Sequence, residues 1–156
     1  METDWDVRGK VALITGAASG IGRATVLRMA ADGATVVGFD RDADGLAAVA
    51  DEVGDIEDGT RVMTTVVGDV SVRADCVAAV ECAVTNHGRL DVLANVAGEG
   101  GAHRSPLEIT EAGLIETLNN LIVGRYVCCQ EGAKRMIEKG HGSIINIVSI
   151  AGLSAL

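Results

Sequence analysis

The chain has 156 residues, enough for one compact domain with a hydrophobic core and too few for two ordinary domains. Its net charge of −9 argues against a surface that binds nucleic acid or an anionic membrane, and aromatic residues, at 2%, are too few to stack the bases of a single strand. We therefore expect a single domain, residues 1–156, whose core consists of Ala, Val, Leu and Ile.

The sequence also predicts where the protein works. No apolar run reaches the roughly 18 residues of a membrane span, and the first six residues are acidic, unlike a signal peptide. We therefore expect a cytoplasmic protein without a membrane partner. The cysteines show no Cys-x-x-Cys spacing and no histidine at metal-ligand intervals, which predicts buried, reduced thiols and no metal site: Cys76, Cys82, Cys128 and Cys129.

Short apolar segments alternate with segments of helical periodicity. Strands are predicted from Val11 to the first glycine turn and over 35–39, 62–67, 90–94 and 144–148. Helices are predicted between them: one ending at Gly33, one before Gly54, one capped by Ser71, and a long one over 110–139. This alternation is typical of βαβ units with a parallel sheet and right-handed crossovers.

A glycine-rich turn joins the first strand to the first helix. Gly16 allows a tight turn, Gly20 lets the backbone approach a pyrophosphate, and Gly22 lets the helix pack close to the strand. The pattern favours a phosphate-binding loop at a helix N-terminus. The alternative is a glycine-rich turn that binds nothing.

Five residues end five different predicted strands: Gly16, Asp40, Asp69, Asn95 and Ser149. Ligands of open parallel sheets bind beyond the carboxyl ends of the strands, so we expect these residues to meet in one site.

Asp40 bears on the choice of ligand. It lies 20 residues after Gly20, where a carboxylate accepts both hydroxyls of an adenosine ribose. That carboxylate would repel a 2′-phosphate, so NAD is favoured over NADP, although the neighbouring Arg41 could pair with such a phosphate. The alternative interpretation of Asp40 is a helix-capping or turn aspartate.

Together these motifs resemble the N-terminal part of the short-chain dehydrogenase/reductase family. The family's T-G-x-x-x-G-I-G motif matches Thr15 to Gly22, and its adenine-contacting aspartate matches Asp69, followed by Val70. Its N-N-A-G motif matches Asn95 to Gly98, with Val96 replacing the second asparagine. Its serine after the fifth strand matches Ser149.

The resemblance implies a Rossmann-type, doubly wound α/β sheet of about five strands in the order 3-2-1-4-5, incomplete at the edge of the fifth strand. It implies hydride transfer between NAD(P) and a small alcohol or ketone, with Ser149 orienting the substrate. The cofactor-binding residues it implies are Gly16, Ser19, Gly20, Ile21, Gly22, Asp40, Arg41, Asp69, Val70, Asn95, Ala97 and Gly98.

Two positions depart from the family pattern. The family's active-site asparagine aligns with Leu121, not Asn120, and one interpretation is that Asn119 and Asn120 are ordinary amides on the helix surface. The alternative is that a local π-bulge restores Asn120 to the site. The family's Tyr-x-x-x-Lys, about a dozen residues beyond the serine, would follow Leu156, so the 156-residue chain is predicted to be inactive. Tyr126 is interpreted as a packing residue.

Other functions therefore remain open. The chain could be a non-catalytic dinucleotide-binding module, or a structural remnant whose long helix mediates dimerisation. An uncovered fifth strand also predicts homo-oligomers or poor solubility.

Overall fold

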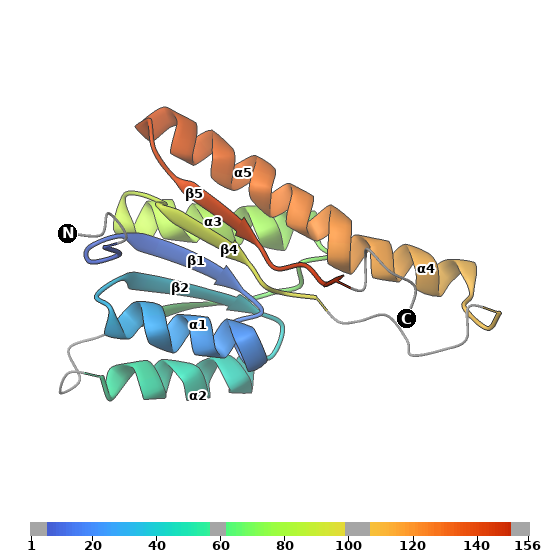
Figure 1. Cartoon of the computed structure of the whole chain (residues 1–156), viewed down its shortest axis with the longest axis horizontal. Helices are drawn as coiled ribbons and strands as arrows, with labels where there is room; N and C mark the ends of the chain where they lie inside the picture. Colours follow the sequence, from blue (N-terminus) through green and yellow to red (C-terminus); the bar gives the residue numbers. More distant parts are fainter. Residues whose placement is uncertain (1–5, 57–61, 99–106, 151–156) are drawn as a thin grey trace.

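The computed structural model describes residues 6–56, 62–98 and 107–150 (Figure 1). Its centre is a parallel sheet in the order β3-β2-β1-β4-β5. The strands are β1 (Val11–Thr15), β2 (Thr35–Asp40), β3 (Met63–Val67), β4 (Val92–Asn95) and β5 (Ser143–Asn146). The predicted class and strand order are confirmed, with strand ends shifted by up to two residues.

Helices cover both faces of the sheet, as expected for βαβ units (Figure 1). α1 (Gly20–Ala31) and α2 (Ala43–Gly54) lie on one face, while α3 (Arg73–His87) and α5 (Gly124–Lys139) lie on the other. Each face has its own apolar cluster, one around Leu46 and Val49 and one around Val80 and Val127. Since β1 is buried along its whole length, both clusters rest on it.

The start of α3 differs from the prediction. Val72, not Ser71, is the N-cap residue, and no side chain caps the helix there. The backbone N–H of Ser71 donates to Asp69 Oδ1 at 2.8 Å, which holds Ser71 in the turn before the helix.

The predicted long helix is interrupted. α4 (Glu111–Leu118) passes into the π-helix η1 (Asn119–Val123), which passes directly into α5. α4 extends past the carboxyl ends of the strands (Figure 1). The packing role predicted for Tyr126 is wrong: its side chain is 63% exposed, because the neighbouring Val127 and Cys128 form the buried face of α5.

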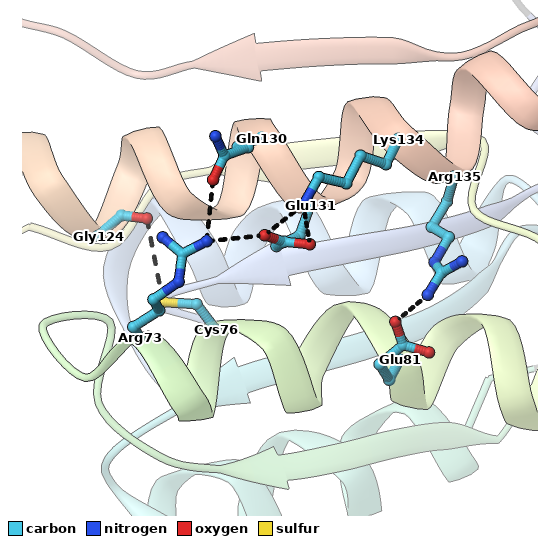
Figure 2. A network of polar contacts seen from close by, with 8 residues as sticks. All are labelled: Arg73, Cys76, Glu81, Gly124, Gln130, Glu131, Lys134 and Arg135. Carbon is cyan, nitrogen blue, oxygen red and sulfur yellow. Dashed lines mark hydrogen bonds and ion pairs between the residues drawn. The ribbon is translucent and has the colours of Figure 1, made fainter.

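Polar side chains fasten α5 to α3 (Figure 2). Arg73 Nη2 donates to Glu131 at 3.0 Å, and Arg135 pairs with Glu81. These contacts add to the apolar cluster in which Val80 of α3 and Val127 of α5 are buried together, and α5 therefore packs along α3.

Candidate cofactor-binding site

A cavity of about 380 Å³ opens at the carboxyl ends of the strands. Ten of the fourteen residues predicted for the site line it: Gly16, Ser19, Ile21, Asp40, Arg41, Asp69, Val70, Ala97, Gly98 and Asn120. The cavity is thus lined by the loops after β1, β2, β3 and β4 and by the π-helix, as expected where the strand order reverses.

The glycine turn has the tight geometry that its sequence predicts. Gly16 has φ +70°, and a Cβ there would lie 2.9 Å from the backbone of Ala97. Gly22 is buried against the carbonyl oxygen of Gly16, where a side chain has no room. Gly20 has φ +52° and open space around it. The turn therefore brings Gly16 and the N-terminus of α1, at Ser19 and Ile21, to the cavity.

Thr15 connects this turn to the loop after β4. Its buried hydroxyl oxygen accepts the N–H groups of Val96 and Ala97, each at 3.0 Å. The glycine turn and the loop after β4, which meet at Gly16 and Ala97, are thereby held together.

Asp40 ends β2 half-buried at the cavity wall. Its Oδ2 accepts the N–H of Ala18, and its Oδ1 accepts the N–H of Asp42, each at 3.0 Å. Asp42, not Asp40, caps α2 by accepting the N–H of Gly45 at 3.0 Å. Each Asp40 oxygen keeps a lone pair for a further donor such as a ribose hydroxyl.

Asp69 is fixed in a turn between β3 and α3. Its N–H donates to Asp75 Oδ2 at 2.9 Å, and its Oδ1 accepts the N–H of Ser71. A Cβ on Gly68 would lie 2.9 Å from Asp75, so the glycine lets α3 approach the turn.

The π-helix places Asn120 on the cavity wall, while Leu121 lies against Gly98. A π-turn holds one more residue than an α-turn while the flanking helices keep their orientation. The π-helix considered for this segment is therefore present, and the active-site role of Asn120 stays a prediction.

Four predicted residues are not on the wall: Gly20, Gly22, Asn95 and Ser149. Asn95 is 1% exposed, and its Nδ2 donates to Asn146 Oδ1 at 3.0 Å and to Cys129 Sγ at 3.2 Å, which joins β4, β5 and α5. Ser149 is exposed beyond β5.

The structure adds lining residues that were not among the predicted site residues: Ala18, Phe39, Asp42, Gly68 and Val96. Each is a neighbour in the chain of a residue or motif that was identified, and that adjacency was the available signal. Among the described ranges, no group of three or more His, Cys, Asp or Glu side chains is placed to hold a metal ion. None of the helices in those ranges is long and apolar enough to cross a membrane.

Comparisons with known proteins agree with this geometry. The family model for short chain dehydrogenases matches residues 10–156. The chain is 37% identical to a D-threitol dehydrogenase of Mycolicibacterium smegmatis, over 100% of this chain and 59% of that protein. It therefore spans less than two thirds of the length of this relative.

Solved structures show the same fold. A levodione reductase superimposes with a TM-score of 0.91 at 32% identity, over 96% of this chain and 57% of the reductase. A carveol dehydrogenase of Mycobacterium avium, solved with NAD, has a TM-score of 0.88 at 29% identity, over 97% of this chain and 58% of that one. A metagenomic short-chain oxidoreductase, solved with NADP, has a TM-score of 0.88 at 30% identity, over 97% and 67%. The chain belongs to the short-chain dehydrogenase/reductase family, whose members bind nicotinamide cofactors.

Proposed function

We propose that this chain binds NAD in the cavity at the carboxyl ends of the strands, and that it is the cofactor-binding part of an oxidoreductase acting on a small alcohol or ketone. The observation that carries the proposal is the position of Asp40: its half-buried carboxylate lines the same cavity as the glycine turn. Relatives solved with NAD and with NADP support a nicotinamide cofactor of either kind, and Asp40 is our reason for favouring NAD.

The residues of the wall fit the cofactor by their chemistry. The N-terminus of α1, which follows the glycine turn, would offer backbone N–H groups to the negatively charged pyrophosphate. Asp40 would accept ribose hydroxyls and repel a 2′-phosphate, while Asp69 would hydrogen-bond to adenine. Ala97 and Gly98, beside the glycine turn, would also contact the cofactor. When bound, the cofactor supplies the hydride acceptor or donor of the reaction.

Two polar side chains are candidates for the substrate end. Asn120 on the π-helix would hold a polar group at the cavity, and Ser149 would donate a hydrogen bond to the substrate oxygen. A hydroxyl at neutral pH is not itself a proton-transfer group of matched pKa, so we expect the 156-residue chain to bind cofactor without turnover.

Titration of the chain with NAD⁺ and NADP⁺, followed by calorimetry, tests the proposal. We expect tighter binding of NAD⁺, lost on Asp40→Arg far more than on Ser149→Ala, because only Asp40 would contact the ribose. Equal losses in the two variants, or no preference between the cofactors, would contradict these roles.

A second candidate is a nucleotide-binding module without enzymatic activity. The exposed position of Ser149, away from the cavity wall, favours it. Assay of NADH oxidation with ketones, by the 156-residue chain and by any longer polypeptide that continues it through a Tyr-x-x-x-Lys motif, separates the two. Turnover only by the longer polypeptide supports the oxidoreductase; none by either supports the module.

A further inference from the structure

Gly124 is the first residue of α5 and lies directly against the backbone of Val70. A Cβ on Gly124 would overlap the carbonyl oxygen of Val70, so backbone meets backbone at this point. Gly124 is buried, and Val70 belongs to the turn that carries Asp69. This Val70–Gly124 contact therefore joins the proposed adenine end of the cavity to the long helix.

Cys76 of α3 contacts both residues, and Figure 2 shows it beside the carbonyl of Gly124. Its buried Sγ donates to the Val70 carbonyl at 3.2 Å and lies 3.9 Å from the Gly124 carbonyl. No long, flexible side chain separates Val70 from Gly124. A displacement of Val70 is therefore transmitted to Gly124, because close-packed interiors absorb little strain.

Gly124 also closes the π-helix. Its own N–H donates to the carbonyl of Asn119, five residues back, which is the hydrogen bond that defines a π-turn. Asn120, which follows Asn119 in the chain, lines the cavity. Ile122 and Val123 on the same π-helix are exposed and do not line it. One residue thus contacts the turn beside Asp69 and fixes the segment that presents Asn120.

We propose that Gly124 is a positioning residue through which binding at Asp69 and Val70 orders the π-helix and so holds Asn120 in the cavity. The inference rests on the proposed function, since it requires a nucleotide at the Asp69 turn. Ordering by one ligand lowers the cost of ordering for a second, so the two ends of the cavity are thermodynamically coupled.

Hydrogen exchange of the 156-residue chain, with AMP as the probe, tests the coupling. AMP carries adenine and ribose but no nicotinamide. We expect it to slow exchange of the Gly124 amide, together with those of Ile122 and Val123, by about fivefold or more. Protection at exposed residues of the π-helix cannot come from direct contact with AMP. Nicotinamide mononucleotide lacks adenine and so leaves the Asp69 turn unoccupied. It should not change the exchange rate of the Gly124 amide.

Gly124→Ala is the matching variant. The added methyl group must separate Val70 from the helix. In this variant AMP should still slow exchange of the α1 amides but should no longer slow exchange of the π-helix amides. Gly132→Ala is the control, because it places the same methyl on the buried face of the same helix, 3.0 Å from Leu93 Cδ2, far from Val70. It should retain AMP protection of the π-helix even if stability falls.

The outcomes separate the two proposals. If AMP and NAD⁺ both bind but AMP leaves the wild-type Gly124 amide unprotected, the coupling is overturned and the cofactor site stands. If neither ligand binds, the proposed function and the coupling both fail. If Gly124→Ala does not fold, the comparison of AMP with nicotinamide mononucleotide on the wild-type chain decides.

Discussion

The hydroxyl oxygen of Thr15 accepts the backbone N–H of Ala97 at 3.0 Å across 82 residues of sequence. The same oxygen accepts the N–H of Val96. Thr15 ends β1 and Ala97 follows β4, so one buried side chain fixes the spacing of the two loops that flank the cavity. The glycine turn and the loop after β4 therefore behave as one structural unit.

Replacement of Thr15 by Val should remove both hydrogen bonds while keeping the shape of the side chain. Two partly buried N–H groups would lose their acceptor, which we expect to lower the free energy of unfolding by about 2 to 4 kcal/mol. Thr15→Ser keeps the oxygen and should cost about 1 kcal/mol for the lost methyl group. Urea unfolding measures both, and equal losses would show that the hydroxyl is unimportant.

Asp91 performs a similar task at the opposite end of the sheet. It is 4% exposed, and its Oδ2 accepts the N–H of Val11 at 2.8 Å. Its Oδ1 accepts from Arg89 Nη2 at 2.6 Å and lies 3.3 Å from His141 Nδ1. Burial alone would raise the pKa of Asp91. The hydrogen bonds from Arg89 and Val11 and the charge of Arg89 together lower it by more than burial raises it, so the pKa lies below its ordinary value.

Asp91→Asn should therefore destabilise the protein in a pH-dependent way. A lowered folded-state pKa means that the carboxylate contributes stability above the unfolded pKa of about 3.9, and that this contribution is lost as pH falls through the folded-state value. We expect a loss of about 2 to 3 kcal/mol at pH 7, shrinking below about pH 4. Asp32→Asn, at an exposed pair with Arg28, is the control and should change stability little. A loss that is constant with pH would contradict the role of the charge.

The sequence predicted those parts of the fold that depend on local pattern. Apolar runs that end in a glycine or a polar residue located every strand of the described sheet, because strand burial and turn chemistry both leave local signals. Contacts between distant segments, such as the hydrogen bond from the Ala97 N–H to the Thr15 hydroxyl, left no local signal. The N-cap of α3 was placed wrongly because Ser71 lies in the turn that Asp69 stabilises. Exposure of Tyr126 was missed because only the packed structure shows which face of α5 meets the sheet.

The edge beyond β5 should drive self-association. Val148 is 78% exposed and Ile150 is 77% exposed, and residues 143–150 contain no charge or proline that would discourage edge pairing. We expect light scattering to show oligomers of the 156-residue chain that shift towards monomer on Val148→Lys. Val62→Lys, at a 76% exposed residue before the opposite edge strand, should not produce this shift. A sharp monomer peak for the unaltered chain would contradict the prediction.

The π-helix leads to a prediction about whether Asn120 takes the place of the family's active-site asparagine. Asn120 lies four residues before Gly124, whereas the family's asparagine aligns with Leu121, three residues before it. If η1 accommodates one additional residue, deletion of Ile122, a 58% exposed residue, should restore a continuous α-helix from α4 to α5.

Asn120 would then lie three residues before the glycine, with both flanking helices in their present orientation. We expect the deletion variant to be at least as stable as the parent and to retain NAD⁺ binding, because a regular α-helix replaces the less favourable π-turn while the cavity wall is preserved. Deletion of Val127, one buried residue within α5, is the control and should destabilise strongly, since it rotates the following helix by about 100°. Thermal unfolding and calorimetry measure both variants. Loss of NAD⁺ binding on deletion of Ile122 would show that the π-turn itself, rather than the placement of Asn120, shapes the cavity.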